Sequence, residues 1–310
     1  MKLYHSQRGV VLCLLCLLCL LCFLPTSGEE AAVVRFAVIA DSGTGDAHQY
    51  KIAEQMVRWH QQRPYSLVLM LGDNIYGFWW RSGRKEDFEE KFDQPYAELL
   101  RRGVVFRAAL GNHDTYTREG RDLIEDHERF HIDGSDGYYS FTAGQLPAAP
   151  TGGTPHIEFF VLNSVRLEKD RQDPEQLAWL AQALAASRAR WRIAYFHHPI
   201  YSSGKRHRED LQLRAKLEPL FRGSDSSGTP ACRRQGLSRA ERDKENRGAL
   251  APAGQPPRVQ VALSGHEHIY ERFQPQHGIV YFTVSSGKLA QGGATARPDV
   301  AAREDQQRTF

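Results

Sequence analysis

Short apolar runs rich in β-branched residues recur along the chain, and they alternate with stretches of helical periodicity. Such runs, bounded by polar or glycine-rich turns, are typical of buried strands. The alternation predicts an α/β fold with one or two largely buried sheets. We expect strands at residues 33–40, 66–71, 104–110, 156–162, 191–196, 258–263 and 279–284, and helices at residues 47–61, 87–101, 173–186 and 208–221. Pro95 should kink or split the second helix, because proline lacks a backbone N–H.

Five short segments with metal-binding side chains follow these expected strands. They are Asp41-Ser42-Gly43, Gly72-Asp73-Asn74-Ile75-Tyr76, Gly111-Asn112-His113-Asp114, His197-His198-Pro199 and Gly265-His266-Glu267-His268. The carboxyl ends of neighbouring strands converge on one rim of a sheet, so these distant segments are expected to meet there. Each segment alone also fits a turn or a helix cap. Their joint occurrence at strand ends favours one metal site.

The side chains of these segments suit two adjacent metal ions. They combine carboxylate and amide oxygens, imidazole nitrogens and one phenol. Two close cations need an anionic bridge, and Asp73 is placed to supply one with its carboxylate. His266 and His268 lie two residues apart near a strand end, so they project to the same side and can bind metal together.

Gly43 and Tyr76 are the most discriminating pair in this motif set. The set resembles the calcineurin-like metallophosphoesterase superfamily over roughly residues 33–290. That superfamily begins with Asp-x-His, whereas its purple acid phosphatases have Asp-x-Gly and a tyrosine three residues after the bridging aspartate. The chain therefore looks like a purple acid phosphatase. The resemblance implies a four-layer α/β/β/α sandwich with a mixed β-sandwich core and a di-metal site at the C-terminal strand ends.

The same resemblance implies two metal ions, Fe(III) and a divalent ion that is iron, zinc or manganese. The Fe(III) is expected to bind Asp41, Asp73, Tyr76 and His268. The divalent ion is expected to bind the bridging Asp73, Asn112, His197 and His266. A phenolate is a hard anionic donor that favours a trivalent ion, whereas oxygen and imidazole ligands suit each divalent candidate. His197 rather than His198 fits the family pattern His-x-Pro.

The implied reaction is attack of a metal-activated hydroxide on the phosphorus of a phosphate ester. The leaving alkoxide needs a proton donor, and the phosphate needs further hydrogen bonds. His113 fits these roles because it follows the ligand Asn112. His207 is the second catalytic candidate, in a stretch (residues 202–208) that resembles the family's substrate-facing loop, although it also fits an exposed basic loop. His198 is the third candidate.

These expectations describe a monomeric acid phosphatase that hydrolyses phosphate monoesters. Two alternatives remain open: a phosphodiesterase or nucleotidase on the same fold, and a non-catalytic binding protein that retains the fold. The intact ligand set argues against the second alternative. No nucleic-acid partner is expected, because the chain without its first 28 residues is close to charge balance.

The first 28 residues differ from the rest of the chain. Lys2 and Arg8 form a basic start, residues 10–24 are apolar, and residues 25–28 offer small residues for cleavage. This pattern favours a cleaved signal peptide and secretion to an extracellular, periplasmic or lysosome-like compartment, with no stable membrane partner. The alternative is an uncleaved membrane anchor. Cleavage would leave only Cys232, so no internal disulfide is expected.

Residues 29–310 are expected to form a single catalytic domain. Within it, residues 223–257 are rich in Gly, Pro, Ser and charge, which predicts a disordered surface insertion. A regulatory or protease-sensitive flap is the alternative interpretation of this stretch. The chain ends soon after Ser285-Ser286-Gly287, where the family continues into a further strand, so we expect an edge strand to be missing.

Overall fold

The computed structural model describes residues 33–77, 85–115, 127–134, 136–145, 155–223, 258–287 and 293–304. The chain divides into the units Met1–Val33 and Val34–Phe310, and the second unit holds every described helix and strand. The expected signal peptide and all but the first residue of the expected insertion lie outside the described residues. Within the described ranges, no helix is long and apolar enough to cross a membrane.

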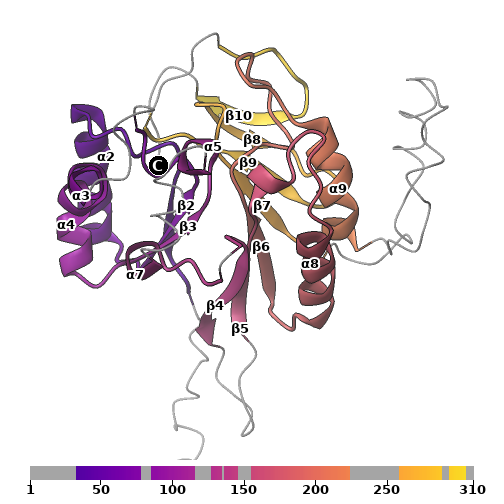
Figure 1. Cartoon of the computed structure of the whole chain (residues 1–310), viewed down its shortest axis with the longest axis horizontal. Coiled ribbons are helices and arrows are strands. Elements are labelled where there is room, and N and C mark those ends of the chain that lie inside the picture. The colour runs from indigo at the N-terminus through magenta and orange to yellow at the C-terminus, as the bar shows by residue number, and fades with distance from the viewer. Residues whose placement is uncertain are drawn as a thin grey trace, which may run out of the picture. The chain divides into compact units, whose positions relative to one another are not determined.

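Two β-sheets form the centre of the second unit (Figure 1). The smaller sheet is parallel and has the order β1-β2-β3, with strands β1 (Phe36–Ile39), β2 (Leu67–Leu71) and β3 (Val105–Ala109). The larger sheet has the order β10-β8-β9-β7-β6-β5-β4. Its strands are β4 (Tyr139–Gln145), β5 (Pro155–Val161), β6 (Trp191–Tyr195), β7 (Val261–Ser264), β8 (Tyr270–Phe273), β9 (Val280–Thr283) and β10 (Val300–Glu304). Strands β5, β6, β7 and β9 are parallel to one another, whereas β4, β8 and β10 run antiparallel to their neighbours.

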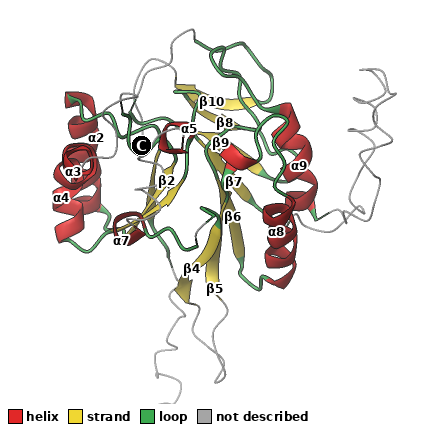
Figure 2. Cartoon of the chain, viewed as in Figure 1, coloured by secondary structure: helices red, strands yellow, loops and turns green. Residues whose placement is uncertain are grey.

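Helices cover the outer face of each sheet (Figure 2). On the side of the smaller sheet lie α2 (Ala47–Gln62), α3 (Lys85–Phe88), the π-helix η1 (Glu89–Asp93) and α4 (Gln94–Arg101). On the side of the larger sheet lie α8 (Pro174–Ala186) and α9 (Leu211–Arg222). The remaining described helices are short: α5 (Asn112–Thr115), α7 (His127–Phe130) and η2 (Ser164–Arg166). This order of layers confirms the four-layer α/β/β/α sandwich.

One hydrophobic core fills the space between the two sheets and continues between the smaller sheet and helices α2 and α4, and a second lies between the larger sheet and helices α8 and α9. Along β5, Phe159 belongs to the first core and Phe160 to the second, because side chains alternate along a strand. Phe159 packs edge-on against Phe36 of β1, with ring centroids 5.3 Å apart. The Tyr195 hydroxyl of β6 donates to the Arg107 carbonyl of β3 at 3.2 Å. The two sheets therefore share one interior.

The four predicted helices are confirmed, with small shifts at their ends. The second of them is divided near Pro95, because η1 separates α3 from α4 and ends two residues before this proline. Pro95 has no N–H to bond the carbonyl of Lys91, and that carbonyl instead accepts a hydrogen bond from the Gln49 side chain. The carbonyl freed by the predicted interruption at the proline thus forms a contact with α2.

Strands β4, β8 and β10 are not predicted by the sequence pattern. The edge strand β10 pairs with β8, so the expectation that the chain lacks a further strand after Ser285-Ser286-Gly287 is wrong. The sequence of β10 has no alternating apolar pattern, and its side chains reach distant partners instead: Glu271 of β8 is fully buried, and Arg303 Nε of β10 lies 3.1 Å from its Oε1. Such a pairing of distant residues leaves no periodic signal in the sequence of either strand.

Candidate metal centre

The predicted ligand residues lie at the carboxyl ends of five strands. The strands and the residues that follow them are β1 with Asp41, β2 with Asp73, β3 with Asn112, β6 with His197 and β7 with His266. Within the smaller sheet, Asp41 N donates to Gly72 O at 3.1 Å, and within the larger sheet Gly265 N donates to His197 O at 2.9 Å. His266 N donates to the Asp41 carboxylate at 3.1 Å and so joins the ends of the two sheets. The structure thus brings the distant segments together.

Three oxygen donors form one half of the site. The Tyr76 hydroxyl lies 2.9 Å from Asp73 Oδ2 and 3.3 Å from Asp41 Oδ1, and both carboxylates are buried. Burial, followed by the charge of Asp73, raises the pKa of Asp41 well above its usual range. Burial and the two carboxylates likewise raise the pKa of Tyr76. A cation among these oxygens would oppose both shifts.

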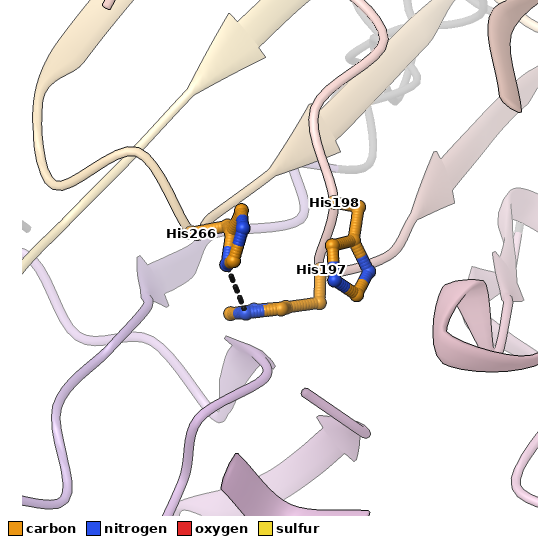
Figure 3. Close-up of side chains that lie close together, drawn as sticks. All are labelled: His197, His198 and His266. Carbon is orange, nitrogen blue, oxygen red and sulfur yellow. Dashed lines mark hydrogen bonds between the residues drawn. The ribbon is translucent and has the colours of Figure 1, made fainter. Parts of the chain in front are cut away.

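Two histidines, His197 and His266, form the other half together with Asn112, and Figure 3 shows the two histidine rings. His197 Nδ1 donates to the Leu71 carbonyl at 2.9 Å, so Nε2 is the ring nitrogen left to bind a metal. That Nε2 lies 3.1 Å from Asn112 Oδ1 and 3.4 Å from Asp73 Oδ1. His266 Nδ1 approaches the same nitrogen to 3.1 Å, along the dashed line in Figure 3. A cation between these atoms could bind the imidazole nitrogen and both oxygens, so this donor set fits a metal ion.

Asp73 contacts both halves of the site. Its Oδ2 accepts from Tyr76, while its Oδ1 faces His197 and accepts from the backbone N–H of His113 at 2.9 Å. In the described part of the chain, two groups have ligand atoms within 4.8 Å of one another: Asp41, Asp73 and His197, and His197, His198 and His266. The two groups share His197, and Asp73 lies between this imidazole and the phenol of Tyr76.

The imidazole of His268 lies farther from the other donor atoms than those of His197 and His266. Its Nε2 lies 3.8 Å from Asp41 Oδ1, while its Nδ1 contacts Arg206 Nη1 at 3.2 Å. A guanidinium only donates hydrogen bonds, so Nδ1 accepts and the proton of the neutral ring lies on Nε2. Metal binding at Nε2 therefore requires Arg206 to leave Nδ1.

His113 and His207 lie on two sides of the donor set. The ring of His113 is 4.6 Å from that of Tyr76, and its side chain is 47% exposed. The ring of His207 is 4.0 Å from that of His266. Burial, with the charge of Arg206, lowers the pKa of His207 to about 4. Both histidines are placed to reach a ligand bound at the cluster.

His198 is buried and has both ring nitrogens engaged. Ser164 Oγ accepts from the backbone N–H groups of His197 and His198, so its single proton points to His198 Nδ1 at 3.0 Å. His198 Nε2 therefore carries the proton of the neutral ring and faces Glu168 Oε2 at 3.3 Å. Burial lowers the pKa of His198 well below its usual range. The centroid of the His198 ring lies 4.6 Å from that of His266, so the two rings pack against each other.

Two buried carboxylates that the sequence motifs contain, but to which no role was given, hold the segments in place. Asp114 accepts hydrogen bonds at 2.8–3.2 Å from Gly111 N, Asn74 N, Ile75 N and Asn74 Nδ2. Burial and the charge of Asp73 raise the pKa of Asp114 to about 8. Glu267 accepts at 2.7–2.8 Å from the backbone N–H groups of Arg206, His207 and Arg208. The only sequence signal for either residue is its position inside a ligand motif.

Gly43 is required by a close approach of backbone. A Cβ at this position would lie 1.8 Å from the carbonyl oxygen of Asn74 and 2.6 Å from Ile75 Cα. The Gly43 carbonyl also accepts from Tyr76 N at 2.8 Å. No side chain fits at residue 43, and Tyr76 instead supplies a donor atom to this side of the site.

Four of the seven predicted ligands have a left-handed backbone. Their φ angles are 53° at Asp41, 52° at Asp73, 72° at His266 and 59° at His268. Non-glycine residues rarely adopt this conformation, and it concentrates at functional sites, where the surrounding structure holds it. Next to these residues, a cavity of about 360 Å³ is lined by His198, His207, Arg208, His266 and Glu168, among others. A ligand at the metal cluster can therefore extend past His207.

The sequence of this fold matches the model of one protein family, calcineurin-like phosphoesterase, over residues 34–270. The chain belongs to the calcineurin-like phosphoesterase family. Membership of this phosphoesterase family, together with the grouped Asp and His donors, supports a metal-dependent hydrolase. The resemblance inferred from the motifs is confirmed at the level of the superfamily.

Individual relatives agree with this assignment of the phosphoesterase fold. Tartrate-resistant acid phosphatase type 5 of Rattus norvegicus is 22% identical over 280 residues, which cover 84% of this chain and 74% of the relative. Among solved structures, GAP50, described as the anchor in the inner membrane complex of Plasmodium, has a TM-score of 0.61 at 15% identity, covering 88% of this chain and 78% of that one. Purple acid phosphatase PPD1 from Lupinus luteus has a TM-score of 0.57 at 17% identity, covering 89% of this chain and 48% of that one.

Proposed function

We propose that this phosphoesterase is an acid phosphatase that hydrolyses phosphate monoesters at a binuclear centre of Fe(III) and a divalent iron, zinc or manganese ion. One observation carries the proposal: Asp73 joins an oxygen cluster that contains a phenol to a cluster that contains imidazole nitrogens. The phenol suits a trivalent ion and the imidazoles suit a divalent one, so the two halves favour different metals. The names of similar proteins, acid phosphatases among them, support a phosphate monoester as substrate.

The proposed ligand sets follow the two halves of the site. Fe(III) would be held by Asp41, Asp73, Tyr76 and His268, and the divalent ion by Asp73, Asn112, His197 and His266. Bound there, the two ions would neutralise charge on the phosphate and lower the pKa of a bound water. The buried carboxylates of Asp114 and Glu267 would keep the ligand-bearing segments in register, as supporting groups around metal sites commonly do.

His113 and His207 would serve the ester itself. In hydrolysis a bond forms between the water oxygen and phosphorus, the ester P–O bond breaks, and the leaving alkoxide takes a proton. His207 lines the cavity into which the alcohol portion would extend, so we assign it the proton donation, which its pKa of about 4 confines to acid solution. His113, beside Tyr76 on the other side, would donate a hydrogen bond to a phosphate oxygen.

The remaining expectations belong to the same proposal. The protein would carry a signal peptide at residues 1–28, act outside the cytoplasm as a monomer, and have phosphate monoesters as its partners, with no nucleic acid and no stable membrane partner. The basic start and apolar run of the first residues support the export, and the near balance of charge supports the lack of nucleic-acid binding.

The test combines metal analysis with hydrolysis. We expect the purified chain to hold two metal ions, to absorb visible light through a tyrosine bound to Fe(III), and to hydrolyse p-nitrophenyl phosphate at acid pH. Tyr76→Phe should remove the absorption, whereas the control His60→Asn, outside the site, should leave both colour and activity unchanged. A colourless chain without iron, with hydrolysis unaffected by Tyr76→Phe, would contradict the proposal.

A non-catalytic protein on this fold is the second candidate. The similarity to GAP50, which is described as an anchor, favours it. A chain that holds two metals but hydrolyses neither p-nitrophenyl phosphate nor bis(p-nitrophenyl) phosphate would support this candidate. Hydrolysis of the diester alone would instead support the phosphodiesterase alternative.

A further inference from the structure

The loop that carries His207 is held in place by the last described segment of the chain. We call residues 202–208 the His207 loop and residues 293–304 the C-terminal segment. Their backbones pair directly: Thr295 N donates to Ser203 O at 2.8 Å, and Lys205 N donates to Gly293 O at 3.1 Å. A further bridge joins Gly204 to Ala294. The start of the loop therefore lies against residues 293–295 as a short ladder.

The ion pair between Glu271 and Arg303 also binds the start of the loop. Glu271 is fully buried, and its carboxylate accepts from Ser203 N at 2.9 Å and from Ser202 Oγ at 3.2 Å. Arg303 of β10 supplies the compensating charge, with Nε 3.1 Å from Glu271 Oε1. The same guanidinium donates through Nη2 to Ser203 Oγ at 2.6 Å and to the Thr295 carbonyl at 2.9 Å. Arg303 thus contacts the His207 loop at Ser203, the carboxylate of Glu271 and the C-terminal segment at Thr295.

A second arginine joins the first residue of the loop to the residue that follows the loop. Arg297 Nη1 donates to the Ser202 carbonyl at 3.0 Å and to Glu209 Oε2 at 2.9 Å, directly after the loop. Asp299 orients this guanidinium through two hydrogen bonds, at 2.9 and 2.7 Å. The C-terminal segment consequently contacts the first residue of the His207 loop and the residue directly after the loop.

The middle of the loop is held from the metal side instead. Glu267 accepts from the backbone N–H groups of residues 206–208, and it lies between the predicted ligands His266 and His268. Gly204 permits this contact, because a Cβ there would lie 2.0 Å from the Glu267 side chain. The position of His207 over the cluster is therefore set by two anchors, one at the ligand segment and one at the C-terminal segment.

We propose that Arg303, acting with Glu271, is a positioning residue that sets the placement of His207 relative to the metal cluster, so that strand β10 controls proton donation to the leaving group. The inference rests on the proposed function, because that reaction gives His207 its role. Misplacement of a catalytic group by about 1 Å can cost on the order of 100-fold in rate. Loss of the anchor at Ser203, four residues from His207, is expected to produce a displacement of this kind.

The first experiment compares two substrates in the full chain loaded with metals. Phenyl phosphate has a poor leaving group that needs a proton, whereas p-nitrophenolate leaves readily without one. In Arg303→Met, we expect kcat to fall by about 10-fold or more for phenyl phosphate and by less than about 3-fold for p-nitrophenyl phosphate. KM and metal content should stay unchanged, and Arg303→Lys should restore part of the loss.

The second readout does not depend on hydrolysis. Amide hydrogen exchange in residues 203–208 should become about 10-fold faster in Arg303→Met, while exchange in β2 and β3 stays the same. In a His207→Ala background, Arg303→Met should cause no further loss of kcat on phenyl phosphate, because Arg303 acts through His207.

Matched variants separate positioning from folding. Arg129→Met removes a comparable two-bond pair, with Asp93 at 3.0 and 2.8 Å in the opposite layer, and should alter neither the substrate ratio nor loop exchange. If the lone carboxylate of Glu271 prevents Arg303→Met from folding, the double variant Glu271→Gln/Arg303→Met removes the buried charge and carries the same test.

Two results would overturn the inference: an unchanged ratio of the two kcat values together with unchanged loop exchange, or an equal further loss in the His207→Ala background. Failure of the proposed function is distinguishable from these. In that case the metal-loaded wild type hydrolyses neither substrate, while faster exchange in Arg303→Met still shows that the anchor holds the loop, and unchanged exchange refutes it.

Discussion

Replacing Gly43 with alanine should separate the two segments that carry Asp41 and Tyr76. The new Cβ would lie 1.8 Å from the Asn74 carbonyl oxygen and 2.6 Å from Ile75 Cα, whereas ordinary contacts begin near 3.4 Å. Both neighbours are backbone atoms of a buried segment, so they cannot avoid the methyl group by rotating a side chain. The segments must therefore move apart by roughly 1.5 Å, which is typical of overpacking.

The expected cost follows from the two contacts that are lost. Overpacking a buried position costs about 1–3 kcal/mol, and loss of the Tyr76 N to Gly43 O hydrogen bond adds about 0.5–1.5 kcal/mol. The free energy of unfolding should thus fall by about 2–4 kcal/mol, out of about 5–15 kcal/mol for an ordinary domain. Because Tyr76 and Asp41 move with their segments, affinity for metal should also fall by about 10- to 100-fold.

Urea unfolding and calorimetric titration with Zn²⁺ measure the two effects. Gly103→Ala is the matched control: its Cβ would have nothing within 4 Å, but Gly103 has φ +75°, so alanine there suffers only backbone strain. That strain should cost about 1–2 kcal/mol and leave metal affinity unchanged. If Gly43→Ala unfolds at the wild-type urea concentration and binds Zn²⁺ normally, the close approach of the two segments is not what requires glycine at residue 43.

Three further results are expected. Arg206→Met should strengthen Zn²⁺ binding severalfold in calorimetry, because the proton of His268 can then move to Nδ1 and leave a lone pair on Nε2. The control Lys205→Met should leave Zn²⁺ binding unchanged. Weaker binding in Arg206→Met would contradict the assigned tautomer of His268. Chelation of the metals should lower the thermal midpoint by about 5–10 °C at ion concentrations near 100 times Kd, and an unchanged midpoint would mean that no metal binds the native state. Arg297 holds the pKa of Asp299 below its usual 3.8, so their pairing stabilises the fold above that pH and is lost as pH falls through the lowered pKa. The difference in unfolding free energy between wild type and Arg297→Met should therefore shrink below pH 3.8. A difference independent of pH would refute this pairing.

The convergence of the ligand segments is predictable because it depends on topology. Parallel strands place their carboxyl ends at one edge, and that rule holds for Asp41, Asp73 and Asn112 in the smaller sheet and for His197 and His266 in the larger one. No exact register is needed for this inference. The interruption at Pro95 is predictable for a similar reason, since a missing N–H acts within one turn of helix.

The contacts that position these ligands are not predictable in the same way. Glu271 and Arg303 pair across 32 residues, and Arg206 reaches His268 across 62 residues. Neither pair has a spacing or hydrophobic pattern that distinguishes it from charged residues at a solvated surface. Strand β10 escaped prediction because its contacts are of this distant kind and its sequence lacks an alternating apolar pattern. Tertiary context, which a local pattern does not contain, decides these features.

The left-handed backbone at Asp41, Asp73, His266 and His268 limits which amino acids can replace these donors. Aspartate, asparagine and histidine tolerate positive φ far better than most residues, and all three also bind metals. Glutamate and cysteine bind metals as well, but they lack this tolerance. An attempt to change the metal preference of the site therefore has to draw on three amino acids at these four positions, while Tyr76, Asn112 and His197, whose φ angles are negative, accept a wider choice.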